Sequence, residues 1–595
     1  MPRSPTAAPV RRRPLADFRA DPRLLVLVAM ALLIGLAGTV AAWGLLALIA
    51  LVTNLAWFGR FAIGSASLAG ATPSLWMVCL PPLGGLVIGL MARFGSEKIR
   101  GHGIPEAIEA ILIGGSRMSP KVAVLKPVSS AISIGTGGPF GAEGPIIMTG
   151  GALGSLFAQF FHLSAAERKT LLVAGAAAGM TAIFGTPVAA VLLAVELLLF
   201  EWRPRSFIPV VAAAVTATVL RPALFGEDPL FPFAADPVLP WWGLIACAGL
   251  GVAAGLLSGL LTTLLYACED AFERLPIHWM WWPALGGLAV GLGGLVEPRA
   301  LGVGYDVIAD LLGGHLALKA VLLILGVKAA IWLVALSSGT SGGVLAPLLI
   351  LGGAMGWVAG TLLPGHPGFW ALLGMAAMLG GTMRAPLTGA LFAVELTGDV
   401  HALPGLLAAS AAAYAVTVLL LKRSILTEKI ARRGQHVTRE YGIDPHELTR
   451  VADVMVRDVD TLPGAMPLPE AAAVLAAGRH RTYPVVDDAG RPVGLVSRAD
   501  ALLWTTEPEH GGERLDGRVP EDALAVVHPG DVTAHAIELM LATGQGRLPV
   551  TDPESGRLVG LLTRKDLLQV RAAFGRAEAE RQAYFVRGPK AAQSA

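Results

Sequence analysis

Three short stretches combine glycines with a proline and then continue as an apolar run: GHGIPEAI (101–108), GAEGPII (141–147) and GGVLAPLL (342–349). Proline is favoured in the first turn of a helix, where its missing N–H has no helical partner, and glycine lets the preceding backbone turn. A helix that begins in this way presents free N–H donors and a positive dipole end, which favour an anion. Together the stretches predict an anion site built from helix N-termini.

The second stretch carries one carboxylate, Glu143. It is the only formally charged residue between Lys126 and Glu167, and glycines, prolines and apolar residues surround it. Holding a carboxylate at membrane depth costs about 2.5–3.5 kcal/mol on insertion scales, so its presence here favours a functional role. The alternative is a buried glutamate that pairs with Lys126 for structural reasons.

The elements that must position these stretches are membrane helices. Of the 595 residues, 54% are hydrophobic and only 15% are charged, with a mean hydropathy of +0.62. A soluble protein of this size needs more charge on its surface. Several apolar runs are near or above the ~20 residues that cross a bilayer, which predicts a multi-span membrane protein. These runs are 24–57, 74–93, 206–222, 240–266, 318–337 and 403–421.

Charge and cysteine content exclude other classes. The formal net charge of +2 implies no nucleic acid or other polyanionic partner. Cys79, Cys247 and Cys268 lie in apolar stretches without metal-ligand spacing, so neither a metal site nor redox chemistry is expected. The basic segment 1–22 resembles the start of a signal peptide, but the apolar run after it is too long. It is expected to be a cytoplasmic tail.

The membrane part repeats itself. GPIIMTGGALG (144–154) matches APLLILGGAMG (346–356), and TPVAAVLLAVEL (186–197) matches APLTGALFAVEL (385–396), in the same order and at nearly the same offset. Such repeats indicate two halves around a central substrate site. The expected fold of residues 23–421 is an all-α polytopic membrane domain with an internal repeat and many tilted and discontinuous helices. We expect the second half to be inverted.

A soluble part follows the membrane part. YPVVDDAGRPVGLVSRADAL (483–502) matches LPVTDPESGRLVGLLTRKDLL (548–568), and each copy has the pattern of strand, turn, strand and helix. This pattern predicts two tandem α/β modules. The expected segments are a charged linker (422–449), a first module (450–506), a second module (515–575) and a tail (576–595).

These motifs resemble those of the CLC family of chloride channels and chloride/proton exchangers. The family's anion-site motifs are similar to Gly-Ser-Gly-Ile-Pro, Gly-x-Glu-Gly-Pro and Gly-x-Phe-x-Pro. This chain has Gly101–Pro105, Gly141–Pro145 and Gly343–Pro347 in the same order. The α/β repeat is similar to the paired cytosolic CBS modules that many members carry. The resemblance covers about residues 23–575.

The resemblance implies how the site works. Chloride is expected to bind at the three motifs, and Glu143 is expected to be the gate. When ionised, Glu143 occupies the position of a permeating chloride; when protonated, it swings aside. The residues implied to line the anion site are Gly101, His102, Gly103, Ile104, Pro105, Gly141, Ala142, Gly144, Pro145, Gly343, Val344, Leu345, Ala346, Pro347 and Leu426.

The chain departs from the family pattern at four positions. His102 replaces a serine, and its imidazole N–H is expected to bind chloride, more strongly when the ring is charged. The alternative is a ring turned away while backbone amides bind the anion. Leu345 replaces a phenylalanine at a position where backbone N–H groups do the binding. Leu426 replaces a tyrosine that helps to close the inner side, which predicts a less guarded inner mouth.

The fourth departure concerns proton transfer. Leu197 stands where many exchangers keep a second, inward proton-accepting glutamate. Its neighbour Glu196 is the repeat partner of Glu395, which favours a shared structural role for these two. Leu197 and Leu426 together favour a passive chloride channel. The alternative is a chloride/proton antiporter.

The CBS-like modules raise the possibility of nucleotide regulation. In modules of this type, an aspartate can bond the ribose of ATP, ADP or AMP, and a Ser or Thr three residues earlier can bond a phosphate. The positions implied are Ser497, Asp500, Thr563 and Asp566. The alternative is that the modules only help the protein to dimerise.

We therefore expect a multi-pass protein of the cell membrane, with both termini cytoplasmic, that conducts chloride as a homodimer with one pathway per subunit. No enzyme activity is expected. SSGTSGG (337–343) is loosely similar to a serine-nucleophile loop, with Ser341 as the nucleophile, but strand–turn–helix context and a partnered His and Asp are missing. A CBS-bearing cation channel would need spans lined by carboxylates, and these spans carry few.

Overall fold

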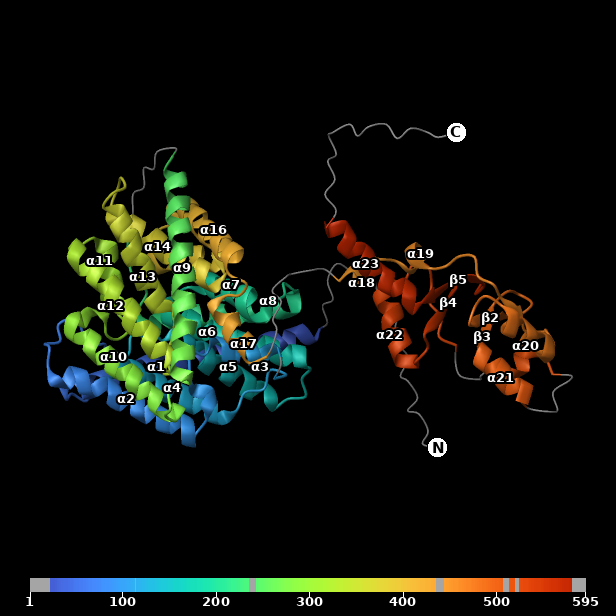
Figure 1. Cartoon of the computed structure of the whole chain (residues 1–595), viewed down its shortest axis with the longest axis horizontal. Coiled ribbons are helices and arrows are strands. Elements are labelled where there is room, and N and C mark those ends of the chain that lie inside the picture. Colours follow the sequence, from blue (N-terminus) through green and yellow to red (C-terminus); the bar gives the residue numbers. More distant parts are fainter. Residues whose placement is uncertain are drawn as a thin grey trace. The chain divides into compact units, whose positions relative to one another are not determined.

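The computed structural model describes residues 22–112, 114–234, 242–434, 444–506, 513–519 and 524–579. The chain forms two compact units, a helical one within residues 18–440 and an α/β one that includes residues 441–595. Figure 1 labels the elements of each unit.

The helical unit contains two successive sets of helices. The first set is α1 (Arg23–Phe58), α2 (Leu75–Phe94), α3 (Ile104–Leu112), α4 (Pro120–Gly135), α5 (Glu143–Gln159), α6 (Ala165–Phe184), α7 (Pro187–Leu193), the π-helical turn Ala194–Leu199 and α8 (Pro204–Phe225). The second set is α9 (Gly243–Glu273), α10 (Trp282–Val296), α11 (Tyr305–Gly313), α12 (Leu318–Ser337), α13 (Leu345–Gly360), α14 (Pro367–Met383), α15 (Pro386–Thr397), α16 (Leu403–Leu420) and α17 (Ile425–Arg432). Short 3₁₀ turns lie at Glu97–Ile99, Trp279–Trp281 and Pro298–Ala300.

Long apolar helices enclose shorter buried ones. Seven helical segments of the described residues are long and apolar enough to cross a membrane: Arg23–Phe58, Leu75–Phe94, Pro204–Phe225, Gly243–Glu273, Trp279–Val296, Leu318–Ser337 and Leu403–Arg432. By contrast, α14 is too short for this class and is buried from Gly368 to Met383. The prediction of a multi-span, mostly helical membrane fold is confirmed, and Trp279–Val296 adds a span that the sequence runs did not include.

The repeat in the sequence corresponds to a repeat in helix packing. Gly150 of α5 and Gly175 of α6 meet so closely that a Cβ on either one would collide with the carbonyl oxygen of the other. Gly352 of α13 and Gly374 of α14 meet in the same way. Small residues allow such close contact between membrane helices. The pair α5/α6 and the pair α13/α14 are therefore equivalent elements of the two halves.

Two glutamates link the halves reciprocally. The Glu395 carboxylate of α15 accepts hydrogen bonds from the N–H groups of Val188 (2.9 Å) and Ala189 (2.8 Å) at the start of α7. The Glu196 carboxylate accepts bonds from the N–H (3.0 Å) and hydroxyl (2.6 Å) of Thr388 at the start of α15. Each glutamate caps a helix of the other half, which confirms their expected shared structural role. Such reciprocal capping is expected of two halves that are related by a pseudo-two-fold axis. The inverted orientation of the second half across the membrane stays a prediction.

The α/β unit consists of two modules with separate cores. The first contains α20 (Leu468–Ala477), α21 (Arg498–Thr506) and the sheet β1–β2–β3 (Leu462–Pro463, Thr482–Val486, Pro492–Ser497), with β1 parallel to β2 and β3 antiparallel to it. The second contains α22 (Thr533–Thr543), α23 (Arg564–Ala579) and the antiparallel pair β4–β5 (Arg547–Thr551, Leu558–Thr563). Shorter segments are α18 (Pro445–Leu448), α19 (Val451–Val454) and the 3₁₀ turn Leu515–Arg518. Buried apolar residues form one cluster in each module, which confirms the predicted tandem α/β repeat.

The glycine contact between α13 and α14 yields a stability prediction. We expect Gly352→Val to destabilise the helical unit by about 1–3 kcal/mol, because the new side chain collides with the Gly374 carbonyl and the Met378 side chain. The apparent melting temperature in detergent should fall. The matched control is Gly249→Val on α9, where an added Cβ meets no atom of the described structure within 4 Å apart from the adjacent backbone of its own helix. An equal loss in both variants would contradict the packing account.

Candidate anion site

The three glycine-rich loops of the sequence meet at one place. The Gly141 and Gly343 backbones exchange hydrogen bonds, at 3.2 Å from Gly141 N to Gly343 O and 2.8 Å in the reverse direction. The first loop joins them, because Gly101 N donates to Thr340 O (3.2 Å) and Gly342 N donates to Gly101 O (3.4 Å). Helices α3, α5 and α13 begin directly after these loops. Three helix N-termini thus converge from distant parts of the chain.

Glycine is required where these loops approach one another. A Cβ on Gly144 would collide with the His102 carbonyl oxygen, and one on Gly343 would meet the Gly141 carbonyl. Gly103 also has a positive φ of 90°, which L side chains rarely adopt. Larger residues would hold the three helix starts apart. The motif glycines are therefore explained by close backbone contact.

Lys126 supports the first loop from α4. Its side chain is fully buried, and its ammonium donates to the carbonyls of Ile99 (2.9 Å) and Gly101 (2.7 Å). In the described structure, the Lys126 ammonium therefore bonds these carbonyls, whereas the structural alternative for Glu143 requires a bond to the Glu143 carboxylate. Lys126 holds the loop in place and adds positive charge beside the site.

Glu143, the first residue of α5, is fully buried. Neither carboxylate oxygen has a hydrogen-bond partner at normal geometry within the described chain. The carboxylate lies against Gly141 and Gly343 and faces the N–H groups of Ala346 and of Glu143 itself. A negative group therefore occupies the point at which positive helix ends meet. The dipoles stabilise its charge without fixing it by strong bonds.

Charged side chains from α3, from α17 and from Arg433 just after α17 lie beside the first loop. Glu106 Oε2 accepts from Gly103 N (3.1 Å), while Glu106 Oε1 bonds Arg433 (3.0 Å) and lies 3.8 Å from the Lys429 ammonium. Lys429 also lies against Gly101. Sequence reasoning missed Lys429 and Arg433, because nothing in the α17 segment reveals that it folds back beside residues 101–106.

His102 lies among these charges. Its ring is 2% exposed, its Nδ1 atom has no hydrogen-bond partner in the described residues, and Lys429, Lys126 and Arg433 are electrostatic neighbours. Glu106 is the opposing negative neighbour. Burial disfavours a positive charge on the ring, and the three cations oppose it further. His102 is therefore better suited to act as a neutral N–H donor than as a charged ligand.

The remaining predicted site residues lie at the three helix starts and at α17. They are all buried: Ile104, Pro105, Ala142, Pro145, Val344, Leu345, Ala346, Pro347 and Leu426. Leu426 belongs to the first turn of α17. The carbonyl of Ile425, the residue before it, accepts a hydrogen bond from the Tyr266 hydroxyl (2.5 Å). Tyr266 of α9 therefore anchors the start of α17, where this chain has Leu426 in place of a tyrosine.

Two other sequence candidates have local partners. Ser341 Oγ bonds the hydroxyls of Ser129 (3.0 Å) and Ser130 (2.9 Å), which fixes the third loop against α4. Leu197 is fully buried within the π-helical turn after α7. The Ser341 hydrogen bonds hold the third loop, and Leu197 contributes to the apolar core.

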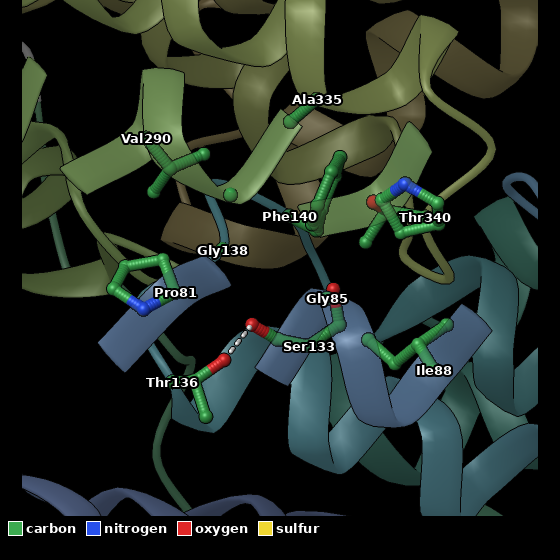
Figure 2. Close-up of a pocket in the computed structure, with 12 residues that line it drawn as sticks. Pro81, Gly85, Ile88, Ser133, Thr136, Gly138, Phe140, Val290, Ala335 and Thr340 are labelled. Carbon is green, nitrogen blue, oxygen red and sulfur yellow. Dashed lines mark hydrogen bonds between the residues drawn. The ribbon is translucent and has the colours of Figure 1, made fainter. Parts of the chain in front are cut away.

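A small cavity lies beside the loops (Figure 2). Phe140, Thr340, Ser133 and Thr136 are among its lining residues. Thr136 Oγ1 donates to the Ser133 carbonyl (3.3 Å), whereas the buried Ser133 hydroxyl has no partner in the described chain. The polar groups that line the cavity are suited to holding water. Since none of the predicted anion-site residues lines it, this cavity is distinct from the candidate site.

The α/β modules bring each predicted Ser/Thr–Asp pair together. Asp500 Oδ2 accepts from the N–H (2.6 Å) and hydroxyl (2.7 Å) of Ser497, at the start of α21. Asp566 Oδ2 accepts from the N–H (2.8 Å) and hydroxyl (2.6 Å) of Thr563, at the start of α23. Both aspartates therefore stabilise helix starts, whether or not a nucleotide is bound.

Comparison with known families and proteins identifies similarities in both units. The family described as "Voltage gated chloride channel" matches residues 84–418, and the CBS domain matches residues 451–506 and 517–573. A ClcB-like chloride channel protein of Ralstonia nicotianae is 30% identical over 422 residues, which are 68% of this chain and 98% of the relative. The voltage-gated ClC-type chloride channel ClcB of Escherichia coli O81 is 32% identical over 388 residues, or 62% and 91% of the two chains.

Solved structures share the fold. A slow cyanobacterial Cl⁻/H⁺ antiporter has a TM-score of 0.60 at 24% identity, over 70% of this chain and 99% of that one. A eukaryotic CLC transporter has a TM-score of 0.55 at 20% identity, over 91% and 98%. A CLC-type fluoride/proton antiporter has a TM-score of 0.58 at 20% identity, over 67% and 97%.

Proposed function

This chain belongs to the CLC family of voltage-gated chloride channels and transporters and moves chloride across a membrane, and we propose that the movement is passive and that Glu143 gates it. The observation that carries this proposal is the buried Glu143 carboxylate at the junction of three helix N-termini, where it has no side-chain partner among the described residues. An anion that the protein supplies thus stands where a permeating anion would be stabilised.

The gate works by competition for one electropositive position. When Glu143 is ionised, the positive helix ends attract its carboxylate, which then excludes chloride. Protonation removes that charge, so the dipoles no longer favour the carboxyl over a chloride ion. Acid should therefore increase anion flux. Within the described residues, the carboxylate faces the backbone N–H groups of Glu143 and Ala346 and has no charged side-chain partner, so its departure breaks no ion pair.

Passive conduction is favoured over proton-coupled exchange by the residues on the α17 side. Leu197 cannot accept a proton, and its neighbour Glu196 is bonded to Thr388. Glu106, a carboxylate on this side, is paired with Arg433 and Lys429. A proton that reached Glu143 would find no free carboxylate among these groups. Exchange remains the second candidate, since two structural neighbours are named as proton antiporters.

Topology and assembly belong to the same proposal. The arginine-rich residues 1–22 favour a cytoplasmic N-terminus, and the soluble α/β unit favours a cytoplasmic C-terminus. The family resemblance supports a homodimer with one pathway in each subunit.

Glu143→Gln should make anion flux insensitive to pH. The amide imitates the protonated carboxyl and no longer competes as an anion, so flux at neutral pH should rise to the level that the unmodified protein reaches in acid. Chloride efflux from reconstituted vesicles, measured at a series of pH values from acid to neutral, tests this effect. The control is Glu273→Gln, an exposed carboxylate at the end of α9. A wild-type pH profile in Glu143→Gln would contradict the gating role.

His102→Ser should change anion preference and leave the pH profile intact. The substitution replaces an imidazole N–H with a smaller hydroxyl at the buried first loop, while the surrounding cations remain. The ratio of nitrate flux to chloride flux should shift severalfold. The control is His162→Ser, an exposed ring after α5. An unchanged ratio would show that the ring does not contact the anion.

We expect adenine nucleotides to stabilise the α/β unit through the Ser497/Asp500 and Thr563/Asp566 pairs. ATP, ADP or AMP at millimolar concentration should raise the apparent melting temperature of the full-length protein in detergent. The double variant Asp500→Ala/Asp566→Ala should lose this increase, whereas the exposed control Asp458→Ala should keep it. No shift with any of the three nucleotides would leave these modules with a structural role.

A further inference from the structure

The second half of the helical unit contains a counterpart of the first anion motif. Gly302 and Gly304 have positive φ angles of 62° and 79°, as Gly101 and Gly103 have 80° and 90°. Each pair precedes a nine-residue helix, α11 or α3. Figure 1 places these two helices on opposite sides of the unit.

A buried lysine supports each of the two loops. Lys328 Nζ donates to the Gly302 carbonyl (2.9 Å), just as Lys126 Nζ donates to the Gly101 carbonyl (2.7 Å). Both ammonium groups belong to fully buried side chains. The α11 loop is therefore built like the α3 loop, and its first helical residue, Tyr305, occupies the position of Ile104.

The Tyr305 side chain lies in an aromatic cluster near Glu143. Its ring packs edge-on against Phe184 (6.3 Å between centroids) and Phe231 (5.8 Å). Its hydroxyl is buried without a hydrogen-bond partner in the described residues, and Glu143 is its electrostatic neighbour. A buried hydroxyl without a partner is unfavourable and uncommon.

The loop before Tyr305 packs against α13, because a Cβ on Gly304 would meet Ile350. The start of α13 also faces Glu143 through the Ala346 N–H. Within the described residues, Tyr305 and Glu143 are thus two buried polar groups beside α13, each without a side-chain partner.

We propose that the Tyr305 hydroxyl receives the Glu143 carboxyl when this group leaves the anion site, so that Tyr305 is a positioning residue for the gate. The inference rests on the proposed gating role of Glu143. A phenol can donate to the carbonyl oxygen of a carboxylic acid and accept from its O–H, so it suits the protonated side chain. The displaced state then satisfies both groups at once.

The other charged groups near Tyr305 are already bonded. Asp306 bonds the Ser67 hydroxyl and the Val307 N–H, and Lys328 bonds the Gly302 carbonyl. The helices α13 and α14, which pack against α11, contain no charged residue. Among the described groups facing Tyr305, Glu143 is therefore the one whose protonation would change the pairing of the hydroxyl.

The test compares Tyr305→Phe in two backgrounds by chloride efflux from vesicles over a range of pH. In the otherwise unmodified protein, the pH of half-maximal activation should fall by about 0.5–1 unit, because the displaced carboxyl loses one net hydrogen bond. In Glu143→Ala, the same change should alter neither the rate nor its pH dependence. Equal effects in both backgrounds, or no shift in the first, would overturn the proposal.

Two controls keep the outcome interpretable. Tyr305→Phe removes one oxygen that has no partner among the described residues, so the fold should be retained, and size-exclusion chromatography checks this. Tyr414→Phe, on the outer α16, should leave the pH profile unchanged. If Glu143→Ala keeps the wild-type pH dependence, the gating role itself fails. If Glu143→Ala is insensitive to pH and Tyr305→Phe has no effect, this inference alone fails.

Discussion

Three helix N-termini that meet in an apolar interior leave free N–H donors and positive dipole ends far from water. This constraint governs the helical unit, because only an anion can balance such a junction. Glu143 supplies that anion from within the chain, and a permeating chloride can supply it from outside. In the gating mechanism that we propose, the same electrostatic demand accounts for a closed state, with the carboxylate in place, and for a conducting state, in which chloride has replaced it.

The surrounding structure holds the junction together. Gly141 and Gly343 bond each other at the pseudo-two-fold position, and glycine at these loops allows the backbones to touch. Lys126 fixes the first loop and Lys328 fixes its counterpart. Farther out, Glu196 and Glu395 join the halves by capping each other's helices. Bonds between the halves thus keep the loops close although the helix dipoles repel one another.

The local part of the site could be predicted from the sequence, whereas its long-range part could not. Glycines and a proline before an apolar run indicate a helix start wherever they occur, so the motifs around His102, Glu143 and Leu345 were recognisable. The matching offset of Glu196 and Glu395 also allowed their structural role to be predicted. In contrast, the folding of distant segments brings Lys429 beside the first loop and Tyr305 near Glu143, and neither residue lies in a motif. The hydrogen bonds of Lys126 to carbonyl groups likewise could not be predicted, because the sequence shows only how far Lys126 lies from Glu143 along the chain.

The central claim is that chloride moves passively through a pathway in which protons act on the gate but are not exchanged. The most direct test is the reversal potential of the purified protein in planar bilayers, with the chloride gradient and the pH gradient set independently. Passive conduction predicts a reversal potential that equals the chloride equilibrium potential and does not move when a pH gradient is imposed. A reversal potential that moves with the pH gradient, in the manner of a fixed chloride-to-proton ratio, would contradict it.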